Sequence, residues 1–407
     1  MTSLIQYVPS CLSLCVLLLS LKMPALAQQH VLPPAQVAAI KQGLDQVYRL
    51  DYALAGKTFE QMIAADPQDP AGYAYLAMVY WAQELGRKQE LGIDRFAASD
   101  FFSQANNYKI SISPAAEARF QKASDQAIEL ARARLRANPA DKAALFIIGL
   151  VFQNLASFDA TLKRSWWSAF RHGSHTHRYH RELLQLEPGF TDAMLSLGVF
   201  NYVAGSLDWK IKWVSLMMGY NGSKTRGKEQ LWTAANHGVL MADAARLSLA
   251  LIYTRERQFQ PAFDLLAGMH KRFPQNYLLH LDMGGLQLAM GHADRALEIY
   301  QDVLKKRQTK SGKYGEIEPG LLYNRIGVAY RAQKNFKAAT EWFQKALSSG
   351  PPAAASSTVA RLELGKTLDL TNRRGEALAY YRQVAAAEDY AGSKNEARRL
   401  IVEPFRR

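Results

Sequence analysis

Apolar and small residues recur at fixed places in consecutive units of the second half of the chain. No segment shows the strict alternation of apolar and polar residues that is typical of a β-strand. Two marks can be followed independently: a small residue early in each unit and an alanine later in it. They stand at Ala250, Gly284, Gly327 and Gly365, and at Ala262, Ala296, Ala339 and Ala377. Because both marks move in the same steps of 34, 43 and 38 residues, the pattern predicts repeated helix pairs joined by linkers of variable length.

The residue types explain how each predicted pair would pack. The small residue lets two helices approach closely, and a bulky residue fills the gap between them, at Leu266, Tyr300, Phe343 and Tyr381. Pro274 and Pro351 would end the second helix of their units, because proline cannot continue a helix. One pair cannot bury its apolar face alone, so we expect neighbouring pairs to stack and form a continuous core.

The first half of the chain carries the same pattern in a looser form. Gly43, Ala55 and Phe59 fit one unit, and a second begins at Tyr73 and is followed by an insertion over 83–113. A third unit begins at Leu145, and a fourth begins at Met194. We therefore expect irregular repeats with insertions before residue 240 and regular repeats after it.

One unit matches a known repeat position by position. It reads Tyr323-x-x-Ile326-Gly327-x-x-Tyr330, then Ala339-x-x-x-Phe343, Ala346 and Pro351. This resembles the tetratricopeptide repeat, and the resemblance covers about residues 36–388. It implies an all-α, right-handed superhelical solenoid of helix-turn-helix tetratricopeptide repeats with helical insertions. It further implies that the first helices build a concave face that binds peptides or partner domains.

A second segment carries a narrower resemblance. It runs Gly205-Ser206-Leu207-x-Trp209, then Gly219-Tyr220-x-Gly222 and Gly227. It looks like a feature of exported bacterial members of the superfamily. More distantly, it resembles the eukaryotic tetratricopeptide family related to the yeast inclusion-clearance protein.

The N-terminal residues look like an export signal. An apolar stretch runs from Cys11 to Leu21, and Ala25-Leu26-Ala27 supplies the small residues that a signal peptidase accepts. Residues 1–10 hold no Lys or Arg, so the usual basic start is missing, and an uncleaved membrane anchor is the alternative. We expect cleavage after Ala27 and a periplasmic or secreted protein.

These observations predict four parts of the chain. Residues 1–27 are a signal peptide, and 28–240 are irregular tetratricopeptide-like repeats with insertions. Residues 241–390 are regular tetratricopeptide repeats, and 391–407 are a C-terminal capping helix or tail. Cys11 and Cys15 both lie in the first part, so the processed chain would contain neither a disulfide nor a reactive thiol.

The formal net charge of +14 bears on the partner. The sequence holds no dense Lys/Arg run with interleaved aromatic residues, so we do not expect nucleic-acid binding. For an exported chain, an anionic membrane surface or an acidic protein is the partner that this charge favours.

Four of the nine histidines lie close together, and imidazole is a good ligand for Zn, Cu or Ni. They are His172, His175, His177 and His180. The segment also aligns with a second helix of the third unit, where His180 takes the bulky packing position. We favour surface and packing roles and expect neither a metal site nor a cofactor, and metal binding stays open as an alternative.

The segment 207–220 is unusually apolar for an insertion, with Trp209, Trp213, Leu216 and Met217 near helical spacing. It could dip into lipid headgroups as an interfacial helix or grip an apolar partner. We favour an extra helix that packs against the superhelix.

Catalytic motifs do not appear in the sequence. The residues Gly219, Gly222 and Lys224 lack the spacing of a phosphate-binding loop, and neither a nucleophile elbow nor a His-Glu-x-x-His motif occurs. We therefore do not expect an enzyme.

The family pattern also indicates which residues line the concave face. In the last four units they are Leu247, Leu251, Arg255, Leu281, Leu288, Asn324, Val328, Arg331, Leu362, Lys366 and Asp369. Apolar residues with scattered cations suit an extended peptide with some negative charge. We expect a non-enzymatic scaffold or adaptor of the cell envelope that binds a protein or peptide client in this groove. A membrane-surface protein using 207–220 and a metal-binding protein or enzyme using the histidines are the alternatives.

Overall fold

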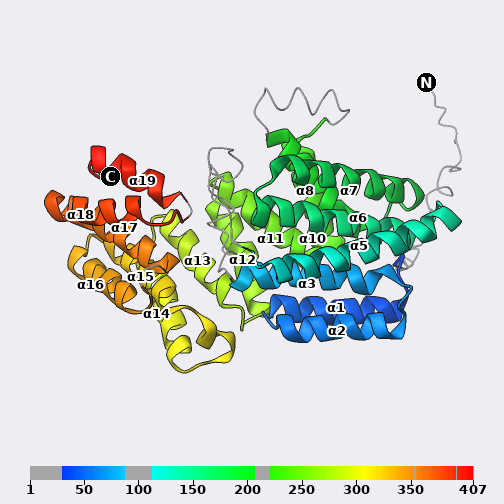
Figure 1. The fold of residues 1–407 in the computed structure, drawn as a ribbon, viewed down its shortest axis with the longest axis horizontal. Helices are drawn as coiled ribbons and strands as arrows, with labels where there is room; N and C mark the ends of the chain where they lie inside the picture. The colour runs from blue at the N-terminus through cyan, green and yellow to red at the C-terminus, as the bar shows by residue number, and fades with distance from the viewer. Residues whose placement is uncertain (1–29, 88–111, 207–220, 352–353, 391, 407) are drawn as a thin grey trace, which may run out of the picture.

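The computed structural model describes residues 30–87, 112–206, 221–351, 354–390 and 392–406 (Figure 1). These ranges are helical and contain no β-strand, which confirms the predicted all-α solenoid. The predicted signal peptide, its cleavage site and the apolar segment 207–220 lie outside the described residues, as does most of the 83–113 insertion.

Within the described residues the helices follow one another as eight antiparallel pairs and a final single helix. In chain order they are α1 Pro34–Tyr48 with α2 Tyr52–Ala65; α3 Pro70–Arg87 with α5 Pro114–Ala137; α6 Lys142–Phe158 with α7 Trp166–Leu186; α8 Met194–Ser206 with α10 Lys224–His237; α11 Ala242–Arg255 with α12 Phe259–Arg272; α13 Tyr277–Ala289 with α14 Ala293–Gln308; α15 Pro319–Ala332 with α16 Phe336–Ser348; α17 Ala355–Leu370 with α18 Arg374–Ala386; and α19 Ser393–Val402. Three short helical turns, Asp159–Lys163, Thr191–Ala193 and Gly312–Glu316, lie in the connections.

Five of the pairs are joined by the same tight turn. In each, one residue adopts a left-handed backbone with φ between 60° and 83°, at Leu50, Arg257, Gly291, Lys334 and Asn372. The amide of the next residue reaches back five positions, as Asp51 N does to Gln46 O at 2.8 Å. This is the Schellman arrangement, which satisfies the last carbonyls of the first helix. The repeated turn fixes the angle between the two helices of each pair.

The predicted contact between small and bulky residues is present in these pairs. Gly284 faces Tyr300, Gly327 faces Phe343 and Gly365 faces Tyr381, and all three rings are fully buried. A methyl group on any of these glycines would lie 2.3–2.5 Å from the nearest ring carbon, which is closer than packed atoms approach. The glycine therefore sets how closely the two helices of a pair can meet.

The stacked pairs share their apolar cores. One buried cluster runs from α1 to α11, two smaller clusters continue it through α11–α13 and α13–α15, and a fourth joins α16 to α19. Helix α6 with the turn that follows it, Lys142–Lys163, is long and apolar enough to cross a membrane, but 78% of its apolar 18-residue window is buried within the protein. It is thus the central helix of the first cluster.

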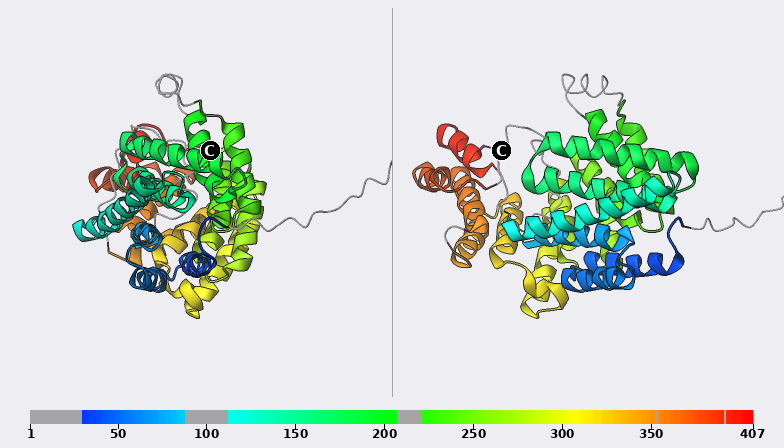
Figure 2. Two further views of the ribbon diagram at one scale, coloured as in Figure 1. Left: turned by 90° about the vertical axis from the view of Figure 1, so that its right-hand side faces the viewer. Right: turned by 45° about the vertical axis from the view of Figure 1, so that its right-hand side comes forward.

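The superhelix comes back on its first pair at the sixth pair. Asn276, before α13, donates to the Tyr48 carbonyl at 2.8 Å, and Lys313 forms an ion pair with Asp51 at 2.9 Å. The rings of Tyr48 and Phe273 lie 5.3 Å apart between centroids. In Figure 2 the blue first pair accordingly lies beside the yellow segment around α14. The N-terminal pairs are therefore braced against the middle of the chain.

Candidate functional site: the face of the first helices

The first helices are buried on more sides than the second helices. In the last three pairs, α13, α15 and α17 bury eight, six and nine residues, whereas α14, α16 and α18 bury four, three and three. This difference is what a superhelix produces when first helices are crowded along its inner side and second helices cover the outside. The prediction that the first helices line the concave face agrees with this burial pattern.

The predicted groove residues divide into two groups. Leu247, Leu251, Arg255, Leu288 and Val328 are half-buried and remain at the surface of α11, α13 and α15. Leu281, Asn324, Leu362 and Lys366 are buried. Arg331 and Asp369 are half-buried as residues, but their side chains are only 13% and 1% exposed. The apolar positions of α11–α15 can thus touch a partner, whereas the polar positions of the last two pairs are engaged within the chain.

A buried ionic network holds the predicted cations. Arg331 forms an ion pair with Glu363. The Lys366 ammonium forms two more, one with Glu363 and one with Glu396, both at 2.8 Å. Burial alone would raise the pKa of Glu363, but Arg331 and Lys366 outweigh it and hold the pKa below its ordinary value. Two carboxylates therefore balance two cations, and this part of the face carries little net charge.

Asn324 also has a partner within the chain. Its amide donates to the Ser356 carbonyl at 2.8 Å and so ties α15 to α17. Asn324, Arg331 and Lys366 are all predicted groove residues. The structure uses all three to hold neighbouring repeats together.

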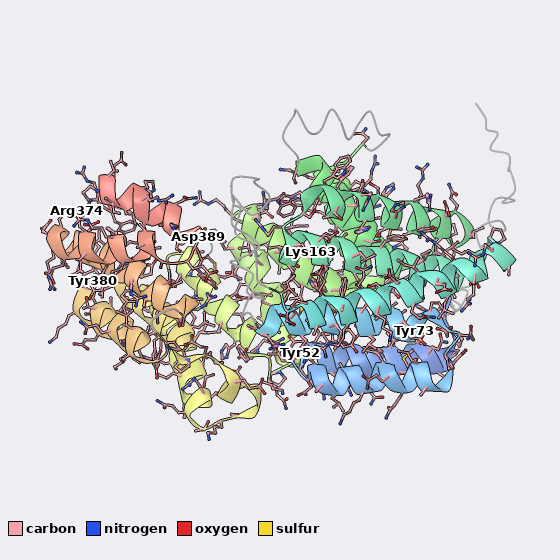
Figure 3. All side chains as sticks on the ribbon, viewed as in Figure 1. Tyr52, Tyr73, Lys163, Arg374, Tyr380 and Asp389 are labelled. Atoms are coloured by element: carbon pink, nitrogen blue, oxygen red, sulfur yellow. The ribbon has the colours of Figure 1, made fainter. Side chains whose placement is uncertain are left out.

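Asp369 lies at the end of α17, where the C-terminus of the chain arrives. Its Oδ2 accepts from the Phe405 amide at 2.8 Å, from the Tyr381 hydroxyl at 2.9 Å and from Arg374 at 3.0 Å. Arg374, which starts α18 beside α19 (Figure 3), also donates to the Leu400 and Ile401 carbonyls, each at 2.8 Å. Burial, and then Asp369, raises the pKa of Tyr381 well above its usual value. These contacts anchor both α19 and the residues beyond it.

The ring of Phe405 lies near both cations of the network. Its centroid is 5.6 Å from the Arg331 guanidinium and 5.6 Å from the Lys366 ammonium, within the range of a cation–π contact. Sequence reasoning missed Phe405, Glu363 and Glu396 as parts of this face. A lone aromatic residue within a charged tail was the signal that could have pointed to Phe405.

The four clustered histidines face different surroundings. His172 contacts Asp159 at 3.0 Å, His175 packs on Phe152, and His177 packs on Phe200. His180 is buried against Gly149 and donates from Nε2 to the Phe146 carbonyl at 3.0 Å. Burial lowers the pKa of His180 to about 4, so its ring is neutral. Among the described residues no group of three or more His, Cys, Asp or Glu is placed to hold a metal ion.

A small cavity of about 270 Å³ lies between α5, α6 and α7, near Lys163 (Figure 3). Its walls include Phe120, Phe158, Asp159 and His172. Ser168 and His172 both contact Oδ2 of Asp159, so the imidazole does not stand between the hydroxyl and the carboxylate. A serine nucleophile needs the imidazole beside its hydroxyl, and these three residues are therefore not arranged for acyl transfer.

Comparison with known proteins agrees with the repeat geometry. The helix pairs, their Schellman turns and their glycine-to-ring contacts are similar to those of the tetratricopeptide repeat. Residues 184–352 match the family Iml2/Tetratricopeptide repeat protein 39. The predicted likeness to the inclusion-clearance-related family is thereby confirmed.

The other similarities are more remote. A segment of 96 residues is 30% identical to the human protein O-mannosyl-transferase TMTC2, and it spans 24% of this chain and 10% of the human protein. Yeast Tom70 is 13% identical with a TM-score of 0.40, over 90% of this chain and 95% of Tom70. The human IFIT1 dimer with m7Gppp-AAAA is 13% identical with a TM-score of 0.43, over 93% of this chain and 89% of IFIT1.

Proposed function

We propose that the chain is a non-enzymatic scaffold of the cell envelope whose first-helix face holds an extended segment of a protein client. The single observation that carries this proposal is the row of apolar side chains along α11, α13 and α15. Leu247, Leu251, Leu288 and Val328 are neither fully buried nor free in solvent. Such half-buried apolar positions on successive helices suit the alternate side chains of an extended peptide.

The charge of the protein supports an acidic client. A formal net charge of +14 attracts negative segments at long range and speeds their encounter with the protein. The cations at Arg331 and Lys366 are already balanced by carboxylates, so the attraction comes from the surface as a whole. Binding should therefore weaken as the salt concentration rises.

Export through a cleaved signal peptide belongs to the same proposal. The side chain of His30, three residues beyond Ala27, is only 7% exposed and lies 3.1 Å from the Asp192 carboxylate. Asp192 also accepts from the Leu240 and Met241 amides, so His30 is tied into the fold. N-terminal sequencing of the protein from an envelope fraction should give Gln28 as the first residue. An intact N-terminus would contradict cleavage after Ala27.

Site-specific photo-cross-linking tests the binding face. A photoreactive residue at Leu251 or Leu288 should capture a protein client in intact cells, whereas one at Gln344 should not. Gln344 is exposed on α16, a second helix, and serves as the matched control on the outer side. Equal capture from both faces, or from the control alone, would refute the assignment of the face.

A further inference from the structure

The last residues of the chain lie on the first-helix face in the way that a bound peptide would. Beyond α19, Glu403, Pro404 and Arg406 are exposed, whereas Phe405 is half-buried. Packing of this tail therefore depends chiefly on one aromatic side chain.

The groups around Phe405 recognise two features of it. Asp369 accepts from the backbone N–H at 2.8 Å, and the charged groups of Arg331 and Lys366 each lie 5.6 Å from the ring centroid. An amide donor and an aromatic face are features that any Phe, Tyr or Trp in an extended segment can offer. The contacts are thus not peculiar to the chain's own C-terminus.

The same groups are held in place without Phe405. Asp369 is fixed by Arg374 and Tyr381, and both cations are fixed by Glu363. A site whose residues are already ordered loses little conformational entropy on binding. It would keep its shape if the tail were released.

We propose that Arg331, Lys366 and Asp369 form the docking site for one aromatic side chain of a client peptide. The chain's own Phe405 occupies this aromatic cradle until a client displaces it. This inference rests on the proposed function, because the client segment would continue from the cradle along the face of α15, α13 and α11. The chain's own tail competes with every client for this site, so only a client that binds more tightly than the tail can displace it.

The experiment uses the full chain and a fluorescent peptide with the sequence of residues 400–407. In anisotropy titrations, Phe405→Ala should bind this peptide at least about tenfold more tightly than the unaltered protein, because the tail no longer offers a ring to Arg331 and Lys366. A tenfold change corresponds to about the energy of one hydrogen bond. Circular dichroism should show the same helical content in both proteins.

Two altered peptides serve as controls that leave the protein untouched. One carries Ala in place of Phe, and the other carries a methyl group on the Phe amide nitrogen, which removes the donor to Asp369. Each should bind the Phe405→Ala protein at least about tenfold more weakly than the parent peptide.

Three results would overturn the inference. The first is equal binding of the peptide to both proteins. The second is equal affinity of Phe405→Ala for the parent peptide and for the peptide with Ala in place of Phe. The third is a folded Phe405→Ala protein that binds no peptide. A dimer of the unaltered protein that Phe405→Ala dissociates would also overturn it, since the tail would then belong to a second copy. Failure of cross-linking from Leu251 and Leu288 would instead count against the proposed function.

Discussion

The close contact between Gly327 and Phe343 can be tested by adding a single methyl group. In Gly327→Ala the new methyl would lie 2.5, 2.7 and 2.9 Å from three carbons of the Phe343 ring. Phe343 is fully buried, so the ring cannot move aside without disturbing the neighbouring pairs. Overpacking of this kind costs about 1–3 kcal/mol.

The helix propensity of alanine works in the opposite direction. Replacing glycine by alanine within a helix gains about 1 kcal/mol. Gly268 in α12 provides the matched control, because a methyl group there meets no atom within 4 Å. The free energy of local unfolding should therefore rise by about 1 kcal/mol in Gly268→Ala. Gly327→Ala should fall about 1–3 kcal/mol below that control.

Hydrogen exchange followed by mass spectrometry is the suitable assay, because a long repeat array need not unfold in one step. Exchange in the peptides that cover each altered pair gives the free energy of local opening. Each variant is compared with the unaltered protein over its own pair, α11–α12 or α15–α16. If Gly327→Ala slows exchange as much as Gly268→Ala does, the argument that glycine sets the approach of the two helices is wrong.

Three further predictions concern the turns, the closure and the pH dependence. Lys334→Gly should raise the free energy of local opening of α15–α16 by about 0.5–1 kcal/mol, because Lys334 has a φ of 63°, which glycine adopts without strain; hydrogen exchange would show it, and faster exchange would contradict it. Asn276→Asp keeps the side-chain oxygen that caps α13 but removes the donor to the Tyr48 carbonyl, so hydrogen exchange around residues 48–52 should become faster. Asn335 caps α16 in the same way, and Asn335→Asp is the control that should leave exchange at 48–52 unchanged. The pKa of His180 lies near 4 in the folded protein, so the unfolded chain binds the extra proton and stability should fall as the pH drops from about 6.5 to about 4. In His180→Gln the proton uptake on unfolding, which sets the slope of stability against pH, should be smaller by up to one proton. An unchanged slope would count against a neutral buried His180.

The repeat could be predicted from sequence because its determinants are local. Gly365 and Tyr381 belong to one helix pair, and the same spacing returns in neighbouring units. The turn conformation was less visible. Gly291 and Asn372 are residue types that favour a left-handed backbone, but Leu50 and Lys334 adopt it as well. Packing on both sides of the turn imposes this conformation on residues that do not favour it.

The closure of the superhelix and the state of the inner face could not be predicted in this way. Asn276 and Tyr48 are 228 residues apart, and no periodic pattern records such a contact. Arg331 and Lys366 lie on the first helices α15 and α17. Both cations form ion pairs with Glu363, and Arg331 also lies near the ring of Phe405. The repeat pattern specifies neither of these partners, and Phe405 lies beyond the last repeat.

Hydroxyl-radical footprinting of the protein with its cross-linked client tests the central claim most directly. The method reports the solvent exposure of individual side chains. Leu247, Leu251 and Val328 on the first helices should lose reactivity when the client is bound, while exposed residues of α12, α14 and α16 keep theirs. Protection confined to the second helices would contradict the claim that the first-helix face is the surface of recognition.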